Sequence, residues 1–291
     1  MTCPKKLIFC PFKVIITIIT LLRVKNKMKF FYHFVIIAFI FASGCIIGWG
    51  IEVIYRRFAP TNKEHVWINP GFLTGPYLPL YGFGLTALYL MASAEKYIHI
   101  ESPVVRKIVL ILVMSVAMTV IEYIAGEIFI VRMRIKLWDY STRWGNYKGI
   151  ICPLFSFFWA VLGAAYYFFI HPHILSALEW FSRNLLFSFC IGFFYGVFII
   201  DVCYSFNLVA KIKEFSEENE IVIKLEELKL HIRRSAKERK EKYNFMLALA
   251  SQTPLSEHLR TYFEKLSEND KLAKLNEKVR EKIEEKKSEK K

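Results

Sequence analysis

The sequence predicts an all-α protein, a polytopic bundle of about five membrane-spanning helices with a charged helical tail. Hydrophobic residues make up 54% of the 291 residues. They are concentrated in runs of about twenty, the length that a helix needs to cross a hydrocarbon core of about 30 Å. From residue 210 onwards the composition changes to a mixture rich in Glu and Lys. We therefore divide the chain into an extension over 1–28, a membrane domain over 29–209 and a tail over 210–291.

The extension over 1–28 contains an apolar run, Leu7–Leu22, which is short for a span. If it crossed the membrane, the four cations after it would lie on the outer side, against the positive-inside rule. Three alternatives stay open: an extra apolar or signal-like segment, an interfacial helix, or an over-extended gene start with translation beginning at Met28. We favour the last.

Five strong spans follow the extension, at about 30–54, 74–94, 106–131, 150–170 and 184–209. Basic residues gather in the linkers after the first and third spans. Because the cytoplasmic side of a membrane protein carries the excess of Lys and Arg, these linkers and the tail are predicted to be cytoplasmic. The sequence thus predicts a multi-pass protein of the cell membrane, with the lipid bilayer as its first partner and a cytoplasmic C-terminus.

The net charge of +14 is unevenly placed, which limits the classes of partner. Residues 211–291 hold 21 basic and 17 acidic residues, so the first 210 residues hold 19 and 9. This excess in the membrane domain indicates orientation, and no basic-aromatic module predicts a nucleic-acid partner. The six cysteines form no Cys-x-x-Cys pair and are expected to be small buried hydrophobes. No metal site and no cofactor are predicted, because no nucleotide or metal motif is present.

The segment Asn69–Gly84 holds three prolines and four glycines at the start of an apolar run. Pro removes a backbone donor and Gly loosens the backbone, so a regular helix is not expected here. In lipid such backbone survives only where protein or a hydrated cavity shields it. We predict a re-entrant turn or a broken helix start that serves as a gate or site wall. Its candidate residues are Asn69, Gly71, Gly75, Pro76, Tyr81 and Gly82.

Four carboxylates lie inside apolar spans, namely Glu52, Glu122, Glu127 and Asp201. An Asp at a span centre costs about 2.5–3.5 kcal/mol, so such groups usually face a bundle interior, a partner or a hydrated cavity. We predict a polar site that opens to the cytoplasm. The alternative is structural: Glu52 and Glu127 could reach headgroups or pair with nearby arginines, and the two deeper groups could bond neighbouring helices.

The linker after the third span adds further candidates to this site: Trp138, Asp139, Ser141 and Asn146. An ordinary local role is equally open, because Trp and Tyr often anchor the membrane interface and Asp and Ser often cap turns. Small residues predict close helix packing at three places. These are Gly44 with Gly48, Gly192 with Gly196, and Gly126 on the face that carries Glu122.

In the tail, apolar residues recur at helical spacing at Ile221, Leu225, Leu228 and Ile232. The stripe is too short for a coiled coil. It predicts a soluble helical appendage, and a helix that docks a partner is the alternative.

Taken together, the motifs of residues 29–205 resemble a bacterial family of ABC-transporter permeases labelled type IV or CmpB-like. The resemblance rests on several short motifs in order. They are Gly48-Trp49-Gly50-Ile51-Glu52, Gly71-Phe72-Leu73-Thr74-Gly75-Pro76, Pro79-Leu80-Tyr81-Gly82-Phe83-Gly84, Ile121-Glu122-Tyr123 with Gly126-Glu127, Trp138-Asp139-Tyr140-Ser141, Asn146 to Gly149, Cys152 and Trp159. The resemblance implies a protein of about five spans in the cytoplasmic membrane and, as partner, a separate ATP-binding-cassette ATPase.

The leading functional hypothesis is a transport permease or transport-associated subunit whose pathway the four carboxylates line. A second hypothesis is a membrane enzyme acting on a lipid or isoprenoid head group, in which Glu122 and Asp139 bind a divalent cation or act as acid and base. A third is a scaffold whose tail recruits a soluble partner. The sequence favours a protein that is not an enzyme.

Overall fold

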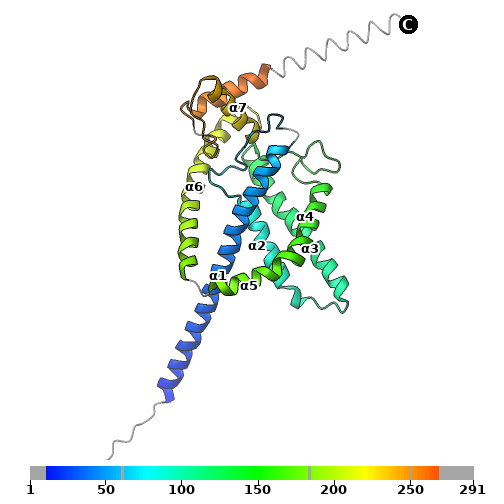
Figure 1. The fold of residues 1–291 in the computed structure, drawn as a ribbon, viewed down its shortest axis with the longest axis vertical. Helices are drawn as coiled ribbons and strands as arrows, with labels where there is room; N and C mark the ends of the chain where they lie inside the picture. Colours follow the sequence, from blue (N-terminus) through cyan, green and yellow to red (C-terminus); the bar gives the residue numbers. More distant parts are fainter. Residues whose placement is uncertain (1–10, 60–61, 183–184, 250, 269–291) are drawn as a thin grey trace, which may run out of the picture.

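The computed structural model describes residues 11–59, 62–182, 185–249 and 251–268. Part of the N-terminal apolar run, residues 7–10, lies outside these ranges. The described chain is a helical bundle in which five helices alternate in direction (Figure 1). Their order is α1 (Pro11–Phe58), α2 (Pro79–Ser93), α3 (Pro103–Gly126), α4 (Pro153–Ala165) and α6 (Leu185–Glu218). The prediction of an all-α polytopic bundle is confirmed.

Four stretches of helix are long and apolar enough to cross a membrane: His33–Phe58, Pro103–Arg132, Pro153–Ile174 and Phe189–Glu218. The second stretch joins α3 to a π-helical turn, η2 (Glu127–Arg132), and the third joins α4 to another, η3 (Tyr166–Ile170). The helix α5 (His171–Ser182) then lies across the end of the bundle opposite α7 (Figure 1). These stretches correspond to four of the five predicted spans.

The fifth predicted span, 74–94, differs from the expectation. Its helix α2 begins only at Pro79 and has 15 residues, which gives a length of about 22 Å, less than the roughly 30 Å of a hydrocarbon core. The backbone before Pro79 is non-helical. Proline at the first helical position is favourable, whereas inside a helix it removes a hydrogen bond. The prolines and glycines therefore produce the broken helix start that the sequence predicted.

Glycines of α1 allow α2 to pack directly against it. A Cβ atom on Gly48 would lie 2.2 Å from the Tyr81 side chain, and one on Gly44 would lie 2.9 Å from Leu85 Cβ. Gly126 is also a contact point, but its neighbour is Ile150 from a linker instead of a helix. The prediction of close packing is confirmed at Gly44 and Gly48.

The same prediction is wrong for Gly192 and Gly196 of α6, because a Cβ atom at either position would meet nothing within 4 Å among the described residues. Instead, α6 crosses α1 through aromatic rings, with Phe41 5.9 Å from Phe198 between centroids. The Tyr195 hydroxyl donates to the Ala38 carbonyl at that crossing. Small residues permit a close approach, but they do not select the partner.

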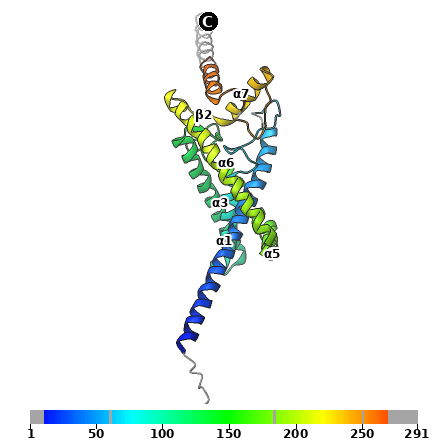
Figure 2. The same ribbon diagram turned by 90° about the vertical axis from the view of Figure 1, so that its left-hand side faces the viewer.

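The first part of α1 projects away from the bundle at the end opposite α7 (Figures 1 and 2). The whole helix has 48 residues, which corresponds to about 72 Å. A short 3-10 turn, η1 (Glu95–Tyr97), connects α2 to α3 near that same end. The connection between α1 and α2, which carries several of the predicted site residues, lies at the other end together with the tail (Figure 1).

The tail packs against the membrane domain. Strand β2 (Ile223–Lys224) pairs in parallel with β1 (Ile135–Lys136) from the linker after α3. The helix α7 (Leu225–Glu238) follows at once, and residues 255–268 form a further helix. The pairing of β1 with β2 therefore joins the tail to the α3–α4 linker through backbone hydrogen bonds.

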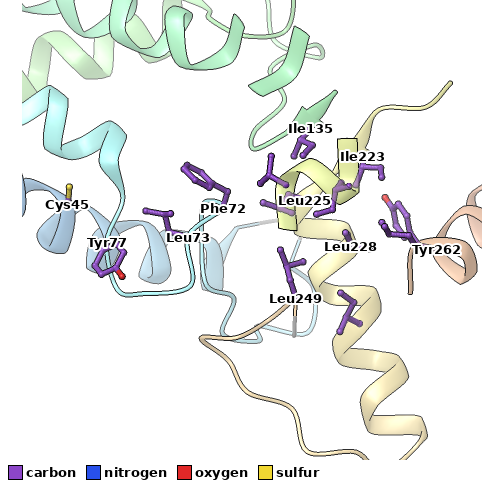
Figure 3. Close-up of a cluster of buried hydrophobic side chains, with 14 residues drawn as sticks. Cys45, Phe72, Leu73, Tyr77, Ile135, Ile223, Leu225, Leu228, Leu249 and Tyr262 are labelled. Atoms are coloured by element: carbon purple, nitrogen blue, oxygen red, sulfur yellow. The ribbon is translucent and has the colours of Figure 1, made fainter. Parts of the chain in front are cut away.

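The apolar stripe of α7 lies inside a hydrophobic cluster. Leu225, Leu228 and Ile232 are at most 2% exposed. They share the cluster with Leu73 and Tyr262, so residues of the α1–α2 connection, α7 and the last helix meet in one place (Figure 3). The stripe of this helical appendage thus packs within its own chain.

Replacing Gly48 tests the α1–α2 contact. We expect Gly48→Leu to lower the thermal unfolding midpoint of the purified protein in detergent, because overpacking typically costs about 1–3 kcal/mol. The matched control is Gly50→Ala, since a Cβ atom at Gly50 meets nothing within 4 Å. An unchanged midpoint for Gly48→Leu would contradict the close packing of these helices.

Candidate functional site

Asn69 organises the connection between α1 and α2. Its Nδ2 donates to the carbonyls of Leu73 at 3.2 Å, Thr74 at 2.9 Å and Met246 at 3.2 Å. Its Oδ1 accepts from Trp49 Nε1 at 2.8 Å. The side chain is buried, so each of these bonds is shielded from competition with water. One amide therefore holds α1, the connection and the tail together.

Asp201 of α6 holds the next part of the connection. Its carboxylate accepts hydrogen bonds from the Gly75 amide at 2.7 Å, the Thr74 hydroxyl at 2.5 Å and the Ser205 hydroxyl at 2.8 Å. The Thr74 amide also donates to it. Buried carboxylates are stable when such donors surround them. This geometry favours the structural alternative for Asp201 over the lining of a pathway.

The glycine and proline candidates of the Asn69–Gly84 segment determine its backbone shape. Gly71 has a φ of +69°, which glycine adopts without strain. A Cβ atom on Gly75 would lie 2.2 Å from the Tyr77 ring, and one on Gly82 would lie 2.4 Å from Cys45 Sγ. Pro76 is exposed. Gly71, Gly75 and Gly82 therefore permit the turn and its packing, and they offer no chemical group of their own.

Glu52 is a shared acceptor at the end of α1. The Tyr81 hydroxyl of α2 donates to its Oε2 at 2.7 Å, and Arg56 Nε donates to its Oε1 at 2.9 Å. Arg56 also donates to the carbonyl of Leu137 at 3.2 Å and forms an ion pair with Glu226 of α7. The guanidinium thus joins a carboxylate of the membrane domain to one of the tail.

Glu122 of α3 is held by neutral donors. Trp159 Nε1 of α4 donates to one carboxylate oxygen at 2.9 Å, and the Tyr140 hydroxyl donates to the other at 2.9 Å. The residue is 3% exposed. Glu52 is near enough for its charge to act on Glu122, and Tyr81 and Trp159 lie edge to face between them, 6.4 Å apart. The structure thus brings two of the four carboxylates into one polar group.

Glu127 lies apart from this group. Its Oε2 accepts from Lys148 Nζ at 3.3 Å, and both side chains are partly exposed. An ion pair of this kind, near solvent, contributes little to stability. Of the structural alternatives for these two residues, an arginine partner is present for Glu52, whereas the ion pair of Glu127 is with a lysine of the following linker.

The candidates in the α3–α4 linker build the linker itself. Asp139 Oδ1 accepts from the Ser141 amide at 3.0 Å. Asn146 donates to the carbonyls of Ser141 and Arg143 and accepts from the Gly149 amide. Partial burial opposes the charge of Asp139, but hydrogen bonds from Ser141 and Lys136 lower its pKa to about 2.

Trp138 and Tyr140 fix this linker to the bundle. Trp138 Nε1 donates to the Ile150 carbonyl at 2.8 Å. The Tyr140 ring stacks on Phe155 at 4.2 Å between centroids, and its hydroxyl reaches Glu122. The membrane-enzyme hypothesis paired Glu122 with Asp139, but these two groups bond to different partners. The linker therefore positions Glu122 through Tyr140.

The sequence interpretation missed Lys229 of α7. Its Nζ donates to the carbonyls of Asn69 and Gly71, each at 2.8 Å, and the residue is 3% exposed. Burial, together with the positive charge of Arg56, lowers the pKa of Lys229 to about 7, against the opposing charges of Glu226 and Asp201. One signal was available: Lys229 stands four residues after Leu225, on the apolar stripe.

The depressed pKa of Lys229 predicts a pH dependence. Once α7 leaves its site, the ammonium regains a pKa of about 10.4, so the undocked state binds more protons between pH 7 and 10. The contribution of Lys229 to stability is therefore least favourable at pH 7 and improves as the pH rises through that window.

This dependence is measured as the thermal unfolding midpoint of the purified protein from pH 7 to pH 10. We expect the midpoint of Lys229→Met to fall behind that of the original protein as the pH rises. The control Lys237→Met changes an exposed lysine of the same helix and should follow the original profile. Parallel profiles for Lys229→Met and the original protein would contradict the depressed pKa.

Comparison with known proteins adds a family to this geometry. No curated protein and no solved structure matches the chain. A family model does match residues 39–206, which is more than half of the chain. The matched range contains α2, α3, α4 and all of the predicted site residues, whereas α7 lies beyond it. The chain belongs to the family described as "Putative ABC-transporter type IV".

Proposed function

We propose that the protein is the membrane-embedded permease subunit of an ABC transporter. Family membership makes it a transport-associated membrane protein. The observation that carries the proposal further is the polar group of Glu52, Tyr81, Glu122 and Trp159, which joins four helices within the matched range. Buried carboxylates in membrane helices commonly mark substrate or ion pathways.

The contacts of Glu122 support a role in the pathway. Its described hydrogen-bond donors are a phenol and an indole, which carry no positive charge. A carboxylate held in this way keeps its attraction for a proton or a cation, whereas one paired with Arg is already neutralised. Glu122 is therefore our candidate for a group that changes partner during transport, with Glu52 as its neighbour.

Charge supports an orientation in which the α7 end is cytoplasmic. The linker between α3 and α4 contains Arg132, Arg134, Lys136, Arg143 and Lys148. The loop between α3 and α4 lies at the same end as the tail (Figure 1), and basic linkers remain on the cytoplasmic side. The sequence contains no nucleotide motif of its own, so ATP hydrolysis would need a separate ATP-binding-cassette ATPase. Because ATP is in the cytoplasm, that partner would bind at this end.

The proposal is tested first by its partner. We expect affinity purification of the full chain from its native membrane to recover a soluble ATPase in stoichiometric amount, identified by mass spectrometry. A bound lipid without any protein partner would instead contradict the permease assignment and favour an enzyme acting on lipid.

A mutation tests the polar group. In the complex reconstituted in vesicles, we expect Glu122→Gln to reduce uptake of its substrate by roughly tenfold or more, since tenfold is about 1.4 kcal/mol, less than a buried charged group commonly contributes. The unfolding midpoint should stay close to the original, because the glutamine carbonyl oxygen can accept from Trp159 Nε1 while its amide nitrogen donates to the Tyr140 hydroxyl. The control Glu127→Gln removes a partly exposed carboxylate and should leave uptake unchanged. Equal uptake in the two variants would exclude Glu122 from the pathway.

A further inference from the structure

The connection between α1 and α2 depends on partners outside itself. Gly71 has a positive φ, and the stretch before Pro79 is non-helical. Its backbone amides at Thr74 and Gly75 bond to the Asp201 carboxylate, and the Leu78 amide donates to the Cys45 carbonyl at 2.9 Å. Irregular backbone near a membrane stays in place only while such groups are satisfied. The elements that satisfy them therefore control the shape of this segment.

The tail contacts the α1–α2 connection from two positions. Lys229 of α7 donates to the carbonyls of Asn69 and Gly71. Beyond α7, the Met246 carbonyl accepts from the Asn69 side chain at 3.2 Å. The tail thus contacts both the backbone and the side chain of Asn69.

Arg56 extends the contact into the polar group of the membrane domain. It bonds to Glu52 and to Glu226, three residues before Lys229. When α7 is docked, the guanidinium is shared between the two carboxylates. When α7 leaves, Arg56 keeps only Glu52 of this pair, so the position of the tail changes the electrostatic surroundings of Glu52.

The free energy that docks α7 comes mainly from its apolar side chains. An ammonium taken out of water carries a desolvation cost, which the hydrogen bonds of Lys229 to the carbonyls of Asn69 and Gly71 offset. Most of the docking free energy then comes from the apolar stripe, in which Leu228 and Ile232 are fully buried. A change that weakens the stripe would therefore release α7 and, with it, the two hydrogen bonds that Lys229 donates to Asn69 and Gly71.

From these contacts we propose that residues 211–268 form an intramolecular clamp that holds Asn69–Gly75 in one conformation. Lys229 is the positioning residue of this clamp, and Glu226 connects it to Glu52 through Arg56. Release of α7 frees the segment and alters the partner of Glu52. The regulatory meaning of the clamp rests on the proposed function, whereas the clamp itself does not.

Hydrogen exchange measured by mass spectrometry on the full chain in nanodiscs tests the clamp. The reporters are the amides of Thr74, Gly75 and Leu78. In Lys229→Met the carbonyls of Asn69 and Gly71 lose their donor, so we expect these amides to exchange about tenfold faster or more. The control Lys237→Met should exchange like the original protein.

A second variant releases α7 without touching the lysine. Leu228→Asp places a charge in the apolar cluster, so the amides of α7 should lose protection. If the clamp exists, the three reporter amides, which are followed in peptides covering 66–78, lose protection together with them. Peptides from α3 serve as the control for the fold of the bundle, and they should stay protected in both variants.

Two results would overturn the clamp. One is equal exchange of 66–78 in Lys229→Met and Lys237→Met. The other is loss of protection in α7 of Leu228→Asp while 66–78 remains protected. If Lys229→Met also exposes α3, then Glu226→Gln replaces it, with Glu238→Gln as the exposed control and the same two criteria. The experiment requires no ATPase and no substrate, so the clamp and the permease assignment can fail separately.

Discussion

The buried amide of Asn69 is the interaction on which the polar end of this protein depends. It bonds to Trp49 of α1, to two carbonyls of its own turn and to Met246 of the tail. A chain that stops being helical at the end of α1 exposes backbone groups in a place with little water, and each unsatisfied group is costly. The Asn69 side chain satisfies several of them at once. This is why α2 can begin late and still pack against Gly44 and Gly48.

The carboxylates that look alike in sequence have different environments. Asp201 has hydroxyl and amide donors and stabilises a turn, and Glu127 has a lysine near solvent. Glu52 shares Arg56 with the tail, whereas Glu122 has only neutral donors among the described residues. Because the charge of a carboxylate in low dielectric is governed by its nearest partners, Glu122 differs from the other three in combining burial with described donors that carry no positive charge and come only from side chains.

The tail lies outside the range that matches the family, yet it completes the structure of the matched part. Its strand β2 pairs with β1, its stripe covers Leu73, and Lys229 reaches the turn at Asn69. A family-level description of residues 39–206 therefore omits part of the immediate surroundings of Glu52.

The sequence by itself determined the all-α class, four of the spans and the broken start of α2, because span length, apolar runs and proline geometry act locally. It also identified Glu52 and Glu122 as unusual, since a charged group in an apolar run is costly wherever the chain goes, and it included Asn69 in the irregular segment before α2. Only the tertiary structure decided their partners. Lys229 is 160 residues from Asn69 along the chain, and Gly192 and Gly196 follow the same motif as Gly44 and Gly48 without a neighbour among the described residues. The sequence pattern shows which residues need a partner. The tertiary structure decides which partner lies close enough to bond.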